Sequence, residues 1–149
     1  MDLSHSVAPQ KILQGAQVLA EITPLFPPDA IHLAVVDPGV GTSRPIVYVE
    51  FSRGRFVCPD NGLLSRLVQR EIPSKIIRVE ATRFFRPQVA PTFHGRDIMA
   101  PVAAHLSHGL DPAKLGPQHE SLRQLDSPAA VKEANRIEAE VVDVDTIGN

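Results

Sequence analysis

The 149-residue sequence contains no tryptophan, one tyrosine and one cysteine. With so few large aromatic side chains, it lacks the platform on which proteins stack the bases of single-stranded nucleic acids. A lone cysteine, Cys58, can form neither an internal disulfide nor a thiolate metal cluster. That usage is typical of a reducing compartment, so we expect a cytoplasmic protein.

An excess of positive charge and long hydrophobic runs are also missing. The 15 Lys and Arg against 17 Asp and Glu give a formal net charge of −2. Proteins that bind nucleic acids or membrane surfaces need a basic face, so we predict neither kind of partner. No apolar run reaches the roughly 18 residues of a membrane-spanning helix. Asp2 follows Met1 where a signal peptide would carry basic residues, which predicts no such leader.

The composition that remains is that of a folded protein. Hydrophobic residues make up 43% of the chain and charged residues 21%, values close to those of globular domains. A chain of 149 residues is long enough to bury one sizeable core. The 14 prolines, about twice the average share, predict many sharp corners.

Apolar periodicity predicts alternating helices and strands. A helix with Ser6 as its N-cap and ending at Pro24 is followed by a strand at 31–36 that is buried on both faces. We then expect strands at 46–51 and 55–58 joined by a hairpin turn across residues 52–54, a helix at 63–70, a strand at 76–79, and a helix at 97–107 stopped by Gly109. This alternation favours an α/β fold with a largely parallel central sheet flanked by helices.

The last third of the sequence changes character. Residues 116–135 are polar and carry Pro117 and Pro128, which is typical of a linker or a surface segment. Residues 137–145 alternate between apolar and polar, as a strand does. This strand is either an edge strand of the same domain or the first strand of a second domain. We therefore divide the chain into a domain at 1–115, a linker at 116–135 and the start of another domain at 136–149.

A loop between two expected strands is the most informative segment. The strand at 31–36 ends in Asp37, and Pro38, Gly39 and Gly41 then force a tight loop that can return Arg44 to the aspartate. In open α/β sheets ligands bind beyond the carboxyl ends of strands, so Asp37 occupies a position expected of a functional group. The alternative is an ordinary turn in which the aspartate bonds its own backbone. A P-loop is disfavoured, because the Gly-Lys-Ser/Thr ending is missing.

Two other segments carry polar groups at similar positions. Asp60 and Asn61 follow a strand and could contact a ligand, although both are also common turn and cap residues. His94 and Asp97 lie at the mouth of a helix, where the histidine suits proton transfer; alternatively Asp97 is an N-cap and His94 a surface residue. Asp37, Asp60, His94 and Asp97 together could hold a divalent ion, but no HxxxH or HxxE spacing supports a metal-dependent hydrolase.

Taken together, the motifs resemble a known family. The stretches DPGVGTSR at 37–44, FVCPDNGLL at 56–64 and TFHGRDIMAPVAAHL at 92–106 stand in the order and spacing of the S-adenosyl-L-methionine (SAM) hydroxide adenosyltransferases. These are SAM hydrolases related to fluorinase and chlorinase. Residues 3–7, LSHSV, are similar to an early motif of the same family. The resemblance extends over nearly the whole chain.

The resemblance implies a homotrimer with an N-terminal α/β domain, a C-terminal β-barrel and sites at subunit interfaces. It implies SAM as the substrate, with no cofactor or metal. Its water-holding triad corresponds to Asp37, Arg44 and His94, which points to hydroxide rather than halide as the nucleophile. We expect His94 to transfer the proton and Asp37 with Arg44 to position the water. The matching substrate-binding residues are Gln10, Thr92, Phe93, Asp145 and Asn149.

The sequence also departs from the family pattern. The family's first strand, whose aspartate holds the ribose hydroxyls, and most of the barrel have no counterpart here, and Ile147 replaces a phenylalanine of the closing motif. The chain is thus interpreted either as a fragment of a longer enzyme or as a truncated, non-catalytic remnant with a structural or interaction role. On both interpretations we expect these 149 residues alone to be inactive and marginally stable.

Overall fold

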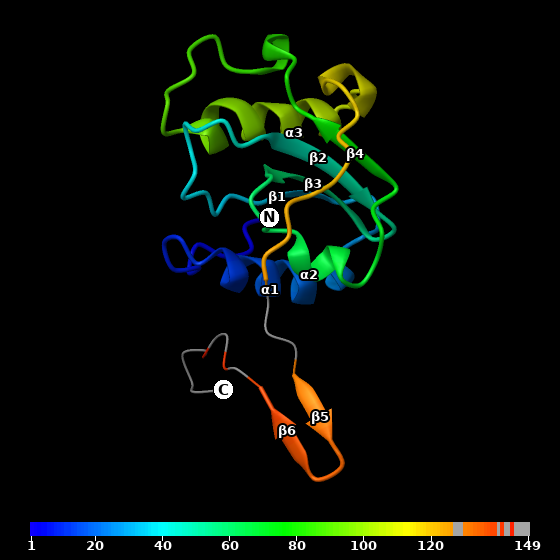
Figure 1. Ribbon diagram of the computed structural model, residues 1–149. Coiled ribbons are helices and arrows are strands. Elements are labelled where there is room, and N and C mark those ends of the chain that lie inside the picture. Colours follow the sequence, from blue (N-terminus) through cyan, green and yellow to red (C-terminus); the bar gives the residue numbers. More distant parts are fainter. Residues whose placement is uncertain (127–129, 140, 142–143, 145–149) are drawn as a thin grey trace.

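Helices lie on both faces of a central sheet in the computed structural model, which describes residues 1–126, 130–139, 141 and 144 (Figure 1). The sheet contains β1 (Ile31–Leu33), β3 (Gly54–Pro59), β2 (Ile46–Phe51) and β4 (Lys75–Arg78), in that spatial order. Helices α1 (Ile12–Ile22) and α2 (Ser65–Val68) cover one face, and α3 (Ala100–Ser107) covers the other. The α/β class expected from the alternation of elements is confirmed.

The sheet is mixed rather than largely parallel. β1 pairs with β3 in parallel, whereas β2 pairs with both β3 and β4 in an antiparallel arrangement. β1, β3 and β4 therefore share one direction, and β2 runs against them between β3 and β4. The cause is the tight connection after Phe51, which pairs directly with Gly54. So short a turn can join only antiparallel strands, and the hairpin expected at residues 52–54 already implied this.

The two central strands are buried on both faces, and this explains their almost continuous apolar sequence. Val49 and Phe56 belong to a core packed under α1 and α2, whereas Tyr48 and Val57 belong to a second core under α3. The lone thiol, Cys58, is completely buried in β3, and this burial raises its pKa. The sheet thus separates two compact cores, one on each of its faces. Polar loops lie at the ends of its strands.

Several element boundaries differ from the sequence-based expectation. Helix α1 begins at Ile12, so Ser6 is not its N-cap, because Gln10 adopts a left-handed backbone with a φ of 67° that cannot belong to the helix. The strand expected at 31–36 ends at Leu33, although the N–H of Ala34 still donates to Val57 O at 3.1 Å. The expectation that it is buried on both faces is wrong, because β1 is an edge strand of the sheet and Leu33 is exposed. Helix α2 is limited to four residues. The last helix begins as a π-helix, Gly95–Met99, which continues into α3, and Gly109 follows its end with a φ of 87°.

Residues 117–125 lie against the sheet and the turn after β3. The backbone N–H of Arg78 donates to Pro117 O at 2.9 Å, and that of His119 donates to Ile76 O at 2.9 Å. This stretch follows a 3₁₀ turn, Pro112–Leu115. The division into a domain, a linker and a second domain stays a prediction.

Beyond this stretch, β5 (Val131–Glu133) and β6 (Arg136–Glu138) pair as a separate antiparallel hairpin whose residues are all exposed. Of the strand expected at 137–145, residues 137–138 belong to β6, whereas the described residues 139, 141 and 144 lie in no strand. Among the described residues, no helix has both the length and the apolar character needed to cross a bilayer.

A buried histidine lies in the aromatic part of the core. The ring of His32 stacks on Phe56 with centroids 4.9 Å apart, and it meets Phe26 edge-on at 5.5 Å. Only 5% of the residue is exposed, and within the described part of the chain its Nε2 atom has no hydrogen-bond partner. Removal from water disfavours the charged imidazolium, so burial lowers the pKa of His32.

The folded state should therefore lose stability as the pH falls through about 6.5, the ordinary histidine pKa, because the unfolded chain then takes up a proton that folded His32 resists. Urea unfolding of the wild type and of His32→Leu between pH 7.5 and 5.5 measures this dependence. We expect a smaller decline in the free energy of unfolding for the variant. Equal declines for the two proteins would contradict this assignment.

Candidate active site

A loop from β1 to β2 forms an arch across the end of β3. Past β1 the chain reaches Asp37, and the turn is tightened by the N–H of Val40, which donates to Asp37 O at 3.2 Å. Thr42 donates through its hydroxyl to Gly39 O at 2.7 Å. Gly41 has a φ of 80°, and a Cβ there would lie 2.8 Å from Pro91 O. The close approach that this glycine allows is thus to the protein's own segment before α3.

The two ends of the arch are joined by an ion pair. Arg44 Nε donates to Asp37 Oδ1 at 2.7 Å, and the guanidinium Nη2 donates to Oδ2. The side chains are only 8% and 4% exposed. Such a bidentate pair fixes the plane of both groups as well as their separation. The arch is therefore more than an ordinary turn, because the carboxylate of Asp37 bonds the returning arginine.

His94 joins this pair from a distant part of the chain. Its Nδ1 lies 3.2 Å from Nη2 of Arg44, and its backbone precedes the π-helix before α3. A guanidinium can only donate, so this hydrogen bond requires an Nδ1 without a proton and places the proton of a neutral ring on Nε2. The structure thus brings Asp37, Arg44 and His94 together, and Nε2 of His94 is the ring nitrogen outside this contact.

Asp97 anchors the segment that carries His94. Its buried carboxylate accepts from Arg96 Nε at 2.7 Å and from the N–H of Ala90 at 2.9 Å, and Arg86 Nη1 lies 3.7 Å away. The hydrogen bonds from Arg96 and then Ala90 lower the pKa of Asp97 to about 2. Asp97 is therefore not the expected N-cap: it lies inside the π-helix and ties residues 86–90 to it.

The turn after β3 uses its polar groups inside the protein. Asn61 Nδ2 donates to Val36 O at 2.8 Å, and Asp60 Oδ1 accepts from the N–H of Arg123 at 2.8 Å. His119 Nε2 lies 3.1 Å from Asp60 Oδ2. No signal in the sequence pairs His119 or Arg123 with this turn. Where the structure describes the chain, no three His, Cys, Asp or Glu converge as metal ligands, so the set of Asp37, Asp60, His94 and Asp97 is not assembled.

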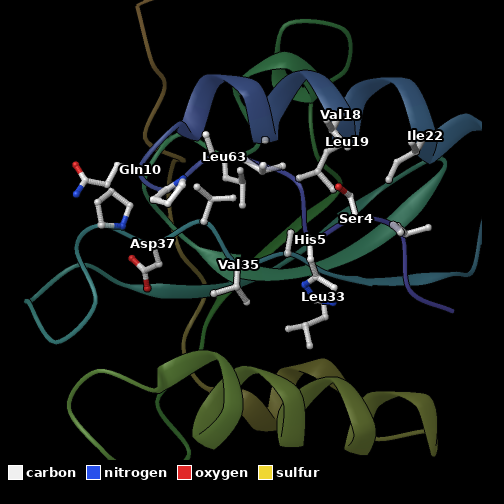
Figure 2. A pocket seen from close by; sticks show the side chains of 18 residues that line it. Ser4, His5, Gln10, Val18, Leu19, Ile22, Leu33, Val35, Asp37 and Leu63 are labelled. Carbon is white, nitrogen blue, oxygen red and sulfur yellow. The ribbon is translucent and has the colours of Figure 1, made fainter. Parts of the chain in front are cut away.

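A cavity of about 430 Å³ opens beside the arch (Figure 2). Its walls are α1, residues 3–10 and residues 33–38, and most of this lining is apolar. Asp37 and Gln10 lie at the same end of this cavity, where the ion pair borders it. The cavity offers an apolar wall next to a charged group.

The remaining predicted binding residues are distributed differently. Thr92 and Phe93 are exposed just before His94, outside the residues that line the cavity. The guanidinium of Arg96 lies 4.6 Å above the Phe93 ring and holds it by a cation–π contact. Asp145 and Asn149 lie outside the described residues. The roles of all these side chains in binding stay predictions.

Comparisons with known proteins identify relatives of this chain. Residues 1–116 match the model of the SAM hydroxide adenosyltransferase N-terminal domain. The whole chain is 43% identical to an (R)-S-adenosyl-L-methionine hydrolase of Salinispora tropica, of which it spans 58%. A fluorinase of Actinopolyspora mzabensis is 24% identical over 78% of the chain and 46% of its own length.

A solved structure of an uncharacterized conserved protein from Thermotoga maritima superimposes with a TM-score of 0.93 at 37% identity. That alignment covers 98% of this chain and 56% of the Thermotoga chain. The chain thus spans about half the length of these longer proteins. The resemblance inferred from the motifs is confirmed, and the chain belongs to the SAM hydroxide adenosyltransferase family.

Proposed function

We propose that the protein containing this chain hydrolyses SAM to adenosine and L-methionine. The observation that carries the proposal is the joining of Asp37, Arg44 and His94 into one hydrogen-bonded group at the end of the sheet. The name of the Salinispora relative, an (R)-S-adenosyl-L-methionine hydrolase, supports the same reaction. In this reaction an activated water attacks the ribose 5′ carbon in line with the bond to sulfur.

The chemistry of the substrate explains why such a group suffices. The sulfonium of SAM leaves as a neutral thioether, so no acid has to protonate the leaving group. Water, with a pKa of about 15.7, is a poor nucleophile, and a cationic donor that stabilises developing hydroxide lowers the barrier. Arg44 provides that positive charge in a site with little exposure to solvent.

The three residues divide the work. Asp37 accepts one hydrogen bond from Nε and one from Nη2 of the guanidinium, so it orients Arg44 toward the water. Nδ1 of His94 accepts from Arg44 and Nε2 carries the proton, so the ring can take a proton from the water only after it rotates and turns Nδ1 from Arg44 toward the water. We therefore assign proton transfer to His94 and positioning to Asp37 with Arg44.

Substrate contacts complete the proposal. Gln10, Thr92 and Phe93 would flank the ribose and the reacting carbon, and Asp145 and Asn149 would hold the methionine amino group and the adenine. We propose that neither metal nor cofactor takes part, and that the protein is a cytoplasmic homotrimer with sites between subunits. The motif resemblance supports these assignments.

The full-length protein should release adenosine and methionine from SAM after treatment with a strong chelator. Liquid chromatography of the reaction mixture measures both products. Added chloride or fluoride should give no more than traces of 5′-halo-adenosine, because a charged triad does not offer halide a dry pocket. A folded full-length sample that forms no adenosine would overturn the proposed reaction, and activity lost with the chelator would point to a metal.

Arg44→Ala should lower kcat by about 10²–10³-fold while KM for SAM changes little, because the guanidinium contacts the developing hydroxide rather than the bound substrate. Arg44→Lys keeps the positive charge but loses the bidentate geometry, so its kcat should lie between those of the wild type and Arg44→Ala. Arg53→Ala, in the exposed β2–β3 turn, is the matched control and should behave as wild type. An increase in KM at unchanged kcat would instead give Arg44 a binding role.

A further inference from the structure

The turn after β3 lies under the arch because β3 is the central neighbour of both β1 and β2. Leu33 of β1 is in register with Val57, and Ile46 of β2 is in register with Pro59. The end of β3 therefore reaches the point where the chain leaves β1 and the point where it enters β2. Residues of this turn can touch both ends of the arch that carries the ion pair.

Two adjacent residues make these contacts. The backbone N–H of Asp60 donates to Pro45 O at 2.9 Å, directly after Arg44. The side-chain Nδ2 of Asn61 donates to Val36 O at 2.8 Å, directly before Asp37. The carbonyl next to each partner of the ion pair, Val36 O and Pro45 O, thus accepts a hydrogen bond from the turn after β3. The first bond is available to any residue except proline, whereas the second depends on the identity of residue 61.

The amide of Asn61 is held in one orientation. The N–H of Leu63 donates to its Oδ1 at 3.2 Å, which leaves Nδ2 to face the carbonyl of Val36. The residue is only 7% exposed, so water cannot readily replace either bond. After the N–H of Ala34, which still donates to Val57 O of β3 at 3.1 Å, Val36 O bonds Asn61. A carboxylate at position 61 would present an acceptor to an acceptor there.

We propose that Asn61 is a positioning residue for the reaction: by holding Val36 O, it sets the direction in which Asp37 presents its carboxylate to Arg44. This inference rests on the proposed hydrolase function. Asn61 acts through Asp37 and contacts neither the water nor SAM. Displacements of about 1 Å in such groups can cost about 10²-fold in rate, so one buried amide is enough to matter.

A purely structural role is the alternative, and the same turn offers a control for it. Ser65 is 1% exposed; its hydroxyl donates to Gly62 O at 2.6 Å and accepts from the N–H of Leu125 at 2.8 Å. Ser65 therefore stabilises the same turn by two hydrogen bonds, one buried and one partly buried, but it bonds neither Val36 nor Pro45. Ser65→Ala should lower the thermal midpoint and leave kcat close to that of the wild type.

The test compares Asn61→Asp, Asn61→Ala and Ser65→Ala in the full-length protein, at a temperature where each is folded by circular dichroism. We expect both Asn61 variants to lose about 10–100-fold in kcat with little change in KM. Asn61→Ala removes the same bonds without adding a charge, so it serves if Asn61→Asp does not fold. A kcat within twofold of the wild type in a folded Asn61 variant would overturn the inference.

A second measurement is independent of turnover. The Nε–H of Arg44 is bonded to Asp37, so it should give a slowly exchanging signal in nitrogen-15 NMR spectra. This signal should persist in Ser65→Ala and broaden or shift in both Asn61 variants. An unchanged signal in those variants would contradict the positioning role. A wild type that shows the signal but releases no adenosine would refute the proposed reaction and leave the positioning of Asp37 to be judged by NMR alone.

Discussion

The ion pair between Asp37 and Arg44 joins the two ends of the arch at the end of the sheet. The positions of Asp37, Arg44 and His94 depend on this contact, because Arg44 also bonds His94. The two partners of the ion pair are seven residues apart and lie at the ends of strands that are separated by β3. Burying two charges costs several kcal/mol of desolvation for each ion, and the attraction between them often does little more than offset it. The benefit of this pair is thus geometric: it fixes a guanidinium plane beside His94.

Support for the pair comes from three sides of the molecule. Asn61 donates to Val36 O just before Asp37, and the backbone N–H of Asp60 donates to Pro45 O just after Arg44. The segment before α3 contacts the arch at Gly41. Asp97 in turn ties that segment to the π-helix, so a carboxylate with no contact to the ion pair still helps to place His94. The loops that carry the ion pair are thus bonded to the strands and helices around them, which holds these polar groups in one arrangement.

The sequence predicted much of this arrangement where local signals were strong. The strands expected at 46–51 and 55–58 are the two central strands, and the Asp-Pro-Gly loop marked the arch and the return of Arg44. The hairpin turn correctly implied that β2 runs against β3. The sheet was nevertheless expected to be largely parallel, because the alternation of strands and helices favours parallel pairing. The links from Asp60 to His119 and from Asn61 to Val36 join residues 59 and 25 positions apart. Local spacing holds no information about such contacts, since they arise only when the strands are ordered in space.

The burial of Cys58 makes strand β3 observable in solution. Its thiol lies at the centre of the sheet, one residue before the end of the strand that carries the turn under the arch. Thiol reagents need an accessible thiolate, so modification requires a transient opening of the sheet around this strand. Because the sequence holds a single cysteine, the labelling rate reports one structural event without competing sites. The free energy of that opening is the local stability of β3, the strand whose following turn bonds both ends of the arch.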